Sequence, residues 1–505
     1  MFSLIAQACG VVFAPVTFLY IFAGTIVGVI FGAMPGVSAS MAVVLAMTFS
    51  YSMQPLPAIA FLVAVYCAAI TGGGITAILF SIPGTPSSAT TTFDGYPMAQ
   101  RGEAGKALGV SLVTSAIGGM FAAFCMALLT QPLASAALAF GPAELFGVSF
   151  LGLSILTCLD NKNVLRTIAS GLMGLLIACV GTDPVSGVMR FTWGQPVLVK
   201  GIALIPTMVG LFAVVEVFKS LAKVGKAKAD DGMDLSKTGK VTTKLCSLKE
   251  LWAMKVTVLR SAVIGTVVGI LPGAGATIAS FLSYAIEVRC SSHPETYGHG
   301  EPLGIAASET ANNAATGGAM VPLLALGIPG GNAAAVMATA LAIKGVNMGP
   351  LLLTTQPIYL YTVFVAQIVV NIIMVVVAIY IAKIFAKILR VPYSMLGTII
   401  IMLSVIGAYS YSKATSDVIL MAIAAIIGYI FIKCHFNSAA LILGLVLGSM
   451  VEKNFRNAFV VGHGSFQEAF MTKPIAMVLL VICFVLLFWP MISMVLPKKE
   501  EKPHE

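Results

Sequence analysis

The stretch Ser308–Asn332 reads SETANNAATGGAMVPLLALGIPGGN, and the rest of the chain is best interpreted from it. It lies in an apolar half of the chain, yet it carries the carboxylate of Glu309, the adjacent amides of Asn312 and Asn313, and the break Pro329-Gly330-Gly331. Polar groups persist at membrane depth only where protein buries them or a wet cavity surrounds them. The break frees backbone N–H groups, which attract anions, and carbonyls, which attract cations. The stretch therefore predicts a solute site.

Composition indicates a helical membrane protein. Of the 505 residues, 58% are hydrophobic and 10% are charged, and the mean hydropathy is +0.99. Soluble domains carry about 25% charged residues, whereas runs of about 20 apolar residues, enough to cross a bilayer, recur along this chain. The first charged residue is Asp94 and the first basic one is Arg101. A cleaved signal peptide needs a positive start, so we expect the first apolar run to be retained as a membrane helix.

The positive charge points to topology and excludes a nucleic-acid partner. The net charge is +9, but the basic residues cluster in short connectors, above all between Lys219 and Arg260. A lysine excess marks the cytoplasmic side of a membrane protein. The nine cysteines are scattered, mostly in apolar segments, and predict no disulfide framework.

The predicted fold is an all-α polytopic membrane protein with about 10 to 13 membrane segments. Its predicted parts are an N-terminal membrane repeat over residues 1–218, a hydrophilic cytoplasmic linker over 219–255, the core of a C-terminal membrane repeat over 256–390, and further membrane segments with a polar tail over 391–505. We expect the Thr71–Gly74 stretch to interrupt its apolar segment, and a later span to begin near residue 312.

The chain contains an internal repeat. Three pairs of segments match in the same order: Gly28-x-x-x-Gly32-x-x-Pro35-Gly36 with Gly265-x-x-x-Gly269-x-x-Pro272-Gly273; Thr71-Gly72-Gly73 leading to Ile82-Pro83-Gly84 with Thr316-Gly317-Gly318 leading to Ile328-Pro329-Gly330; and Met98–Gly102 with Leu341–Gly345. Hydrophobic segments that Gly and Pro interrupt at corresponding positions of two halves indicate the binding site of a secondary transporter. By analogy with that class, we expect inverted repeats with broken helices or hairpins.

These motifs resemble a known family. Residues 28–36, 81–89, the connector 95–104 and 308–330 are similar to the large membrane subunit, TctA, of tripartite tricarboxylate transporters. The resemblance covers nearly the whole chain, although the segments after about residue 390 are generic membrane sequence.

The resemblance implies a multi-pass transporter of the bacterial inner membrane that works with a periplasmic solute-binding protein and a small membrane subunit. It also implies uptake of citrate-like or other carboxylates, driven by a gradient of Na⁺ or H⁺ and without a further cofactor. Lys344 stands where a histidine is common, and Asn347-Met348-Gly349-Pro350 where Pro-Gly-Pro is expected. The particular carboxylate is therefore not carried over, and a homo-oligomer is left open.

Substrate contact is predicted at the two hairpin breaks, Pro83-Gly84 and Pro329-Gly330. The hydroxyls of Thr85, Ser87 and Ser88 follow the first break, and Asn332 follows the second. They could line a half-helix whose N-terminus faces a carboxylate. The alternative is that the hydroxyls only cap that helix or bond back to the preceding turn.

Ion coupling is predicted at two groups of residues. Ser38, Ser40 and Thr277 follow the other pair of Pro-Gly breaks and could bind Na⁺ together with freed carbonyls near Met34 and Leu271. The alternative there is close helix packing through small residues.

Glu309, with Asn312 and Asn313, forms the second group, since a carboxylate at membrane depth is a functional candidate. Glu309 could bind H⁺ or Na⁺, orient the hairpin, or sit in an aqueous mouth before the helix begins. Arg101 and Lys344 could attract carboxylates, but basic residues here more often fix topology.

Other classes of function have less support. The apolar segments contain no H-E-x-x-H, G-x-S-x-G or Walker A motif, so an intramembrane enzyme or an ATP-driven pump is not predicted. A channel-like facilitator of small organic anions stays as the alternative, although broken, duplicated helices fit alternating access better.

Overall fold

The computed structural model describes residues 2–34, 37–138, 140–159, 164–183, 186–215, 217–219, 247–271, 275–388 and 393–495. The predicted Pro-Gly breaks at 35–36 and 272–273, most of the lysine-rich linker and the polar tail lie outside these ranges. The chain divides into two compact units: unit 1, residues 1–138 and 203–430, and unit 2, residues 139–202 and 431–505. The boundaries predicted from the sequence concern repeats rather than compactness, and they stay a prediction.

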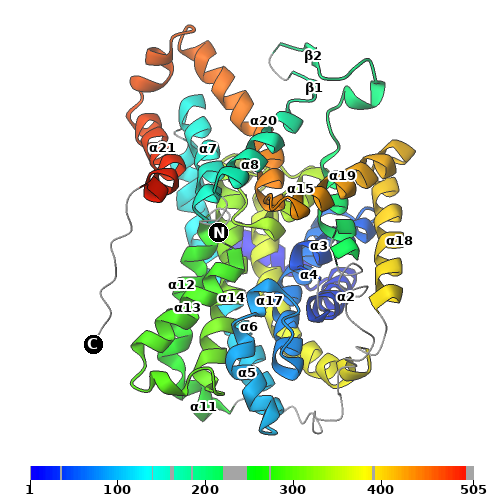
Figure 1. Cartoon of the computed structure of the whole chain (residues 1–505), viewed down its shortest axis with the longest axis vertical. Helices are drawn as coiled ribbons and strands as arrows, with labels where there is room; N and C mark the ends of the chain where they lie inside the picture. Colours follow the sequence, from blue (N-terminus) through cyan, green and yellow to red (C-terminus); the bar gives the residue numbers. More distant parts are fainter. Residues whose placement is uncertain are drawn as a thin grey trace. The chain divides into compact units, whose positions relative to one another are not determined.

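Unit 1 is helical (Figure 1). Its elements are α1 (Phe2–Val12), α2 (Pro15–Ala33), α3 (Ala39–Ser50), α4 (Pro55–Phe80), the 3₁₀ turn η1 (Pro86–Ser88), α5 (Thr91–Gln100), α6 (Ala104–Leu138), α9 (Leu204–Met208), the π-helical η3 (Val209–Val214), α11 (Leu248–Ala253), α12 (Lys255–Ile270), α13 (Gly275–Cys290), η5 (Pro294–Thr296), α14 (Pro302–Leu326), α15 (Asn332–Ile343), α16 (Leu352–Thr355), α17 (Pro357–Ile388), α18 (Tyr393–Ser412) and most of α19 (Thr415–Lys433).

Two helix pairs form the centre of unit 1, α2 with α4 and α12 with α14. Glycines set their spacing: a methyl group on Gly32 would lie 2.0 Å from the Ala69 carbonyl oxygen, and one on Gly269 would lie 2.6 Å from that of Ala315. Small residues of this kind let helix backbones approach closely in a membrane. Packing is therefore one role of the glycines at spacing four.

In each pair the glycine of the hairpin break packs against a glycine already named: Gly84 against Gly32 of α2, and Gly330 against Gly269 of α12. The Gly84 N–H donates to the Gly73 carbonyl (3.2 Å), and the Gly330 N–H donates to the Ala319 carbonyl (3.3 Å). A methyl group on Gly84 would meet the carbonyl oxygen of Gly32, and one on Gly330 that of Gly269. Gly84 corresponds to Gly330 and Gly73 to Ala319, each at an offset of 246 residues. The sequence match of Thr71 with Thr316 has an offset of 245, so it is one residue out of register. Whether the two halves as wholes are inverted repeats stays a prediction.

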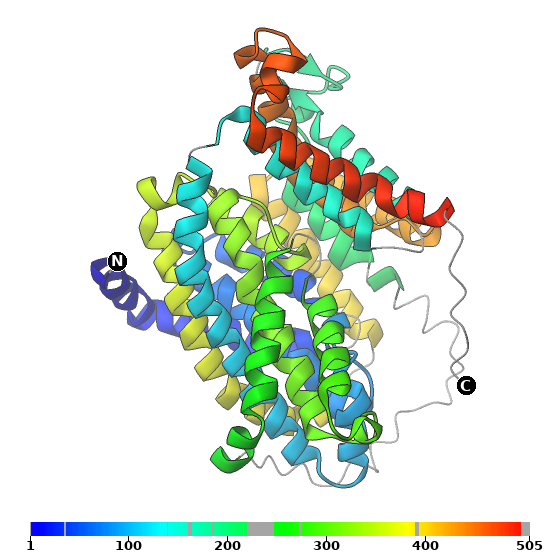
Figure 2. The ribbon, with the colours of Figure 1, turned by 90° about the vertical axis from the view of Figure 1, so that its left-hand side faces the viewer.

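Each hairpin packs against a helix of the other half of the chain. The turn η1 and α5 lie against α13 and α14, whereas α15 lies against α3. The long helices also pack against the other half of the sequence: α6 lies along α12 and α14, and α17 lies along α2 and α4 (Figure 2). The centre of unit 1 is thus built jointly by both halves of the sequence.

Two sequence expectations about helix limits are wrong. The helix α4 runs through Thr71–Gly74 without interruption, because those glycines fit against α2 and against side chains of α14 and η1. The helix α14 begins at Pro302, not near residue 312, and Glu301 caps it by accepting from the Leu303 N–H (3.4 Å).

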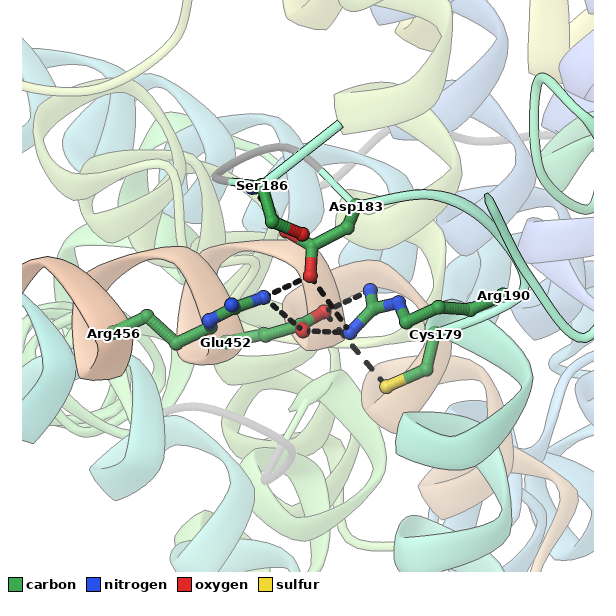
Figure 3. Close-up of polar contacts among 6 residues, drawn as sticks. All are labelled: Cys179, Asp183, Ser186, Arg190, Glu452 and Arg456. Atoms are coloured by element: carbon green, nitrogen blue, oxygen red, sulfur yellow. Dashed lines mark hydrogen bonds and ion pairs between the residues drawn. The ribbon is translucent and has the colours of Figure 1, made fainter. Parts of the chain in front are cut away.

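Unit 2 contains α7 (Pro142–Leu159), α8 (Val164–Ala178), the hairpin strands β1 (Gly181–Thr182) and β2 (Met189–Arg190), η2 (Pro196–Leu198), α20 (Ser438–Val461), the π-helical η6 (Gln467–Met471) and α21 (Pro474–Val495). Phenylalanines pack between α7, α20 and η6: the Phe146 ring is tilted against that of Phe455 (5.0 Å between centroids) and meets that of Phe470 edge-on (5.5 Å). An ion cluster holds the β1–β2 hairpin to α20: Arg190 and Arg456 pair with Asp183 and Glu452 (Figure 3).

The predicted fold class, an all-α polytopic membrane protein, is confirmed. Within the described ranges, five helices, α2, α4, α6, α17 and α19, are long and apolar enough to cross a membrane, and six shorter apolar helices accompany them. The expected 10 to 13 membrane segments stay a prediction.

Candidate functional site

A cavity of about 270 Å³ in unit 1 collects residues from distant parts of the chain. Its lining is Ser38, Ala39, Ser40, Tyr66, Ile70, Thr85, Pro86, Ser87, Gly275, Ala276, Thr277, Gly331, Asn332 and Ala333. Six predicted site residues are thus brought together, three from the predicted substrate group and three from the predicted ion group. The residues predicted to bind substrate and those predicted to bind the coupling ion line the same cavity.

Three helices begin at this cavity. Ser38 is the N-cap of α3, Gly275 opens α13, and Asn332 opens α15 with Gly331 as its N-cap. The first N–H groups of a helix have no partner within the helix, and the helix dipole adds partial positive charge there. The described lining includes no Asp, Glu, Lys, Arg or His. The arrangement suits an anion whose charge backbone N–H groups would face.

The hydroxyls of the first hairpin bond to one another. Thr85 Oγ1 lies 3.1 Å from Ser87 Oγ and 2.9 Å from Ser88 Oγ. Neither η1 nor α5 has a side-chain cap, so capping does not explain these residues. Ser88 is fully buried and is not part of the cavity lining, whereas Thr85 and Ser87 are.

The other predicted residues of the breaks do not line the cavity. Pro83, Gly84, Pro329 and Gly330 are absent from its lining, and the two glycines seat the hairpins on α2 and α12. Ser38 Oγ accepts a hydrogen bond from the Met41 N–H (3.2 Å), so this hydroxyl caps α3 as well as lining the cavity.

Glu309 lies inside α14, fully buried, which excludes the aqueous-mouth reading. Thr91 Oγ1 donates to its Oε1 (2.5 Å), and Ser115 Oγ donates to its Oε2 (3.0 Å). Thr91 opens α5 and Ser115 lies on α6. The carboxylate therefore joins three helices.

The two amides beside Glu309 differ in their contacts. Asn313 Oδ1 accepts from Thr71 Oγ1 (2.7 Å), and Asn313 Nδ2 donates to the Glu309 carbonyl (3.2 Å). Asn312 is fully buried, and neither polar atom of its amide has a hydrogen-bond partner in the described part of the chain. Asn313 is a tie between α4 and α14, while Asn312 presents unpaired donors and an acceptor.

The glycine stretch of α4 stands between the cavity hydroxyls and Glu309. A methyl group on Gly73 would lie 2.3 Å from Thr85 Oγ1, and one on Gly74 would lie 2.7 Å from Glu309 Oε1. Two successive positions of one helix thus face the two sites. This relation depends on close backbone approach, which only glycine permits here.

Three buried polar residues in and around the site, Thr91, Ser115 and Asp94, were not predicted as site residues from the sequence. Thr91 and Ser115 bind Glu309, but a hydroxyl on a helix carries no sequence signal of its own. Asp94 is fully buried: its Oδ1 accepts the N–H groups of Gly298, Gly300 and Glu301. The signal that could have found Asp94 is its place as the first charge in an otherwise apolar run.

Arg101 and Lys344 hold backbone carbonyls. Arg101 donates to the carbonyls of His299 (3.0 Å) and Gly300 (2.9 Å), and Lys344 Nζ donates to those of Tyr51 (3.2 Å) and Met53 (2.8 Å). Burial lowers the pKa of Lys344. Neither side chain lines the cavity.

Comparison with known proteins identifies the family. The model of the tripartite tricarboxylate transporter TctA family matches residues 18–443. The chain belongs to the TctA family.

Two relatives come from Agrobacterium vitis. An uncharacterized 52.8 kDa protein in the TAR-I ttuC′ 3′ region is 35% identical over 483 residues, 95% of this chain and 94% of the relative. An uncharacterized protein in the TAR-II ttuC′ 3′ region is 35% identical over 231 residues, 45% of this chain and 95% of the relative. No solved structure matches.

Membership makes this TctA-family chain a multi-pass membrane component of a tripartite transporter. Because the family's transporters have three parts, membership also implies partner subunits.

Proposed function

We propose that this TctA-family protein carries a di- or tricarboxylate across the bacterial inner membrane by secondary active transport. The observation that supports this most directly is the cavity at which α3, α13 and α15 begin. A carboxylate placed there faces backbone N–H groups and the hydroxyl or amide of Thr85, Ser87 and Asn332. Helix N-termini at a broken-helix site favour anionic substrate groups in secondary transporters.

Glu309 is the proposed coupling site, with Asn312 and Asn313 beside it. A buried carboxylate can take up H⁺, or it can bind Na⁺ together with amide and hydroxyl oxygens. Thr91, which binds Glu309, and Thr85, which lines the cavity, belong to one short segment. A change in the charge at Glu309 thereby reaches the solute cavity through that segment. Ser38, Ser40 and Thr277 supply further oxygens for a cation that enters with the solute.

The proposed partners are a periplasmic solute-binding protein, which delivers the carboxylate, and a small membrane subunit. This proposal is supported by the tripartite character of the family.

Uptake into proteoliposomes that contain this chain and the small subunit tests the proposal. Na⁺ and H⁺ gradients are imposed separately, and radiolabelled di- and tricarboxylates are offered through the binding protein. Accumulation against a solute gradient, dependent on one ion, supports secondary transport and identifies the ion. Flux that stops at equilibrium contradicts it and indicates a channel-like facilitator.

Two adjacent serines provide a matched test of the cavity. Ser87→Ala removes a lining hydroxyl, so we expect KM for the carboxylate to rise about tenfold, as losing a hydrogen bond of about 1.5 kcal/mol to a charged group predicts. Ser88→Ala removes a buried hydroxyl outside the lining that acts on the cavity only through its bond to Thr85, so we expect a clearly smaller rise in KM. Equal KM changes in both variants contradict the placement of the solute in this cavity.

A further inference from the structure

A second and larger hollow lies in unit 1, between α6 and the α11–α12 segment. It has a volume of about 750 Å³ and is called the α6–α12 groove here. Ile117 and Phe121 of α6 form one wall, and Val258 and Ala262 of α12 form the other. Its size falls in the range of about 300–1,000 Å³ that is usual for ligand pockets. The solute cavity and this groove have no lining residue in common.

One end of the groove is cationic and aromatic. Lys249, Trp252 and Lys255 line it there, and no Asp or Glu is among its described lining residues. Lys255 Nζ stands 4.1 Å from the centre of the Trp252 ring. A capping box fixes α11 in place: Ser247 Oγ accepts from the Glu250 N–H, and Glu250 Oε2 accepts from the Ser247 N–H (2.8 Å). This capping box engages the carboxylate of Glu250 at the start of α11.

The flank of α12 carries an exposed apolar stripe. Val256, Leu259, Val263 and Val267 recur at helical spacing and are all largely exposed, from 46% to 64%. An exposed apolar stripe of this kind marks a surface for lipid or for a partner protein. Trp252 is 69% exposed and lies one turn before this stripe, where tryptophan marks the head-group level. If lipid covers the stripe, the groove opens toward acyl chains and its cationic end lies at the membrane surface.

We infer that the α6–α12 groove binds an anionic phospholipid. The acyl chains lie against the apolar walls, and Lys249 and Lys255 hold the phosphate. Basic pockets between membrane helices on the cytoplasmic side bind acidic head groups, and α11 directly follows the lysine-rich segment that the positive-inside rule places on that side. A neutral apolar helix of a partner would gain nothing from the two lysines, which favours the lipid.

The three tryptophans of the chain, Trp193, Trp252 and Trp489, make a local measurement feasible. Trp193→Phe with Trp489→Phe leaves Trp252 as the only indole. The full chain is reconstituted in phosphatidylcholine vesicles that contain, at equal mole fraction, either brominated phosphatidylglycerol or brominated phosphatidylcholine. Bromine quenches the fluorescence of an indole that it touches. We expect the anionic lipid to quench Trp252 more strongly than the zwitterionic lipid.

Lys249→Gln and Lys255→Gln should each lower the preference for phosphatidylglycerol about fivefold, the change that about 1 kcal/mol per lysine corresponds to. The matched control is Lys453→Gln with Lys473→Gln, which removes two exposed positive charges elsewhere and should leave the preference unchanged. Equal quenching by both lipids in the parent protein overturns the inference. So does protection of Trp252 from both lipids when the small subunit is present, because a protein then fills the groove.

Discussion

Thr91 Oγ1 and Glu309 Oε1 lie 2.5 Å apart, although 218 residues separate them in the sequence. The bond runs from the first residue of α5 to the N-terminal third of α14. It ties the segment that carries the cavity hydroxyls to the buried carboxylate. In the proposed function, a change in the charge of Glu309 therefore acts directly on the hairpin that lines the cavity.

Glu309→Gln should abolish gradient-driven uptake and leave the fold intact. The amide keeps the size of the carboxylate and can bond to the hydroxyls of Thr91 and Ser115, but it cannot take up H⁺ or offer a full negative charge to Na⁺. Uptake into proteoliposomes and the amount of protein in the membrane are the measurements. Glu301→Gln, at the start of α14, is the control and should transport normally. Wild-type uptake by Glu309→Gln would remove this residue from the coupling site.

Asp94→Asn should lower the free energy of unfolding by about 3 kcal/mol. Asp94 accepts the N–H groups of Gly298 (2.8 Å), Gly300 (2.9 Å) and Glu301 (2.8 Å) and the hydroxyl of Tyr284 (2.8 Å). Asparagine can keep an oxygen toward the three N–H groups, but it loses the charge that strengthens these bonds, and hydrogen bonds to a charged group contribute about 1.5–3 kcal/mol each. Thermal unfolding in detergent measures the change.

The control for Asp94 is Glu103→Gln. Glu103 is 45% exposed and lies 3.6 Å from Arg101, so its loss should change stability by less than about 1 kcal/mol. Comparable losses in both variants would argue against a special role for the buried carboxylate.

Gly84→Ala should disrupt the seat of the first hairpin. The added methyl group would lie 2.2 Å from the Gly32 carbonyl oxygen and 2.9 Å from Gly73 Cα. Backbone atoms cannot move aside cheaply, so we expect a loss of about 1–3 kcal/mol in stability, as for other overpacked sites, together with most of the uptake activity.

Two further glycines provide a parallel test and a control for this prediction. Gly330→Ala should act in the same way, because its methyl group would lie 2.3 Å from the Gly269 carbonyl oxygen. Gly10→Ala, where a methyl group would meet nothing within 4 Å, should retain full stability and uptake. An inactive Gly10 variant would indicate that alanine is harmful for reasons other than packing.

Glu452→Gln should loosen the β1–β2 hairpin of unit 2. Glu452 pairs with Arg190 and lies 3.7 Å from Arg456, and both arginines also contact Asp183. One carboxylate cannot balance two guanidinium groups that are partly buried. Trypsin should then cut at Arg190 several-fold faster than in the wild type, as gel analysis of timed digests would measure. Glu468→Gln, in η6, should leave the rate unchanged.

The sequence predicted the membrane class, the family and six of the cavity residues, because each depends on local signals. Pro-Gly breaks end helices wherever they occur, and the residues just after them open the next helix. The joint cavity could not be predicted, since it exists only because α3 and α13 pack against hairpins from the other half of the chain. Thr91 and Ser115 carry no motif, and they became visible only as the partners of Glu309.

The uninterrupted course of α4 shows why intrinsic helix propensity fails to predict structure at these glycines. Three consecutive glycines predicted a break at Gly72–Gly74, since glycine weakens an isolated helix. In the folded protein the same residues are tightly packed: Gly72 meets α2, Gly73 meets Thr85, and Gly74 meets Glu309. Tertiary contact outweighs intrinsic helix propensity at such a site.

In the proposed function, the solute cavity attracts anions with peptide dipoles instead of ionised side chains, and this has a consequence for acidity. Its described walls carry no group that changes charge between about pH 5 and pH 9. The affinity of the walls for a fixed ionic form of the solute should therefore stay constant over that range. A citrate-like molecule loses its own last proton within it, so the cavity would select among ionic forms of the solute while its own charge stays the same. Glu309, which lies against Gly74 while the cavity hydroxyl of Thr85 lies against Gly73, is the proposed source of any further acid sensitivity.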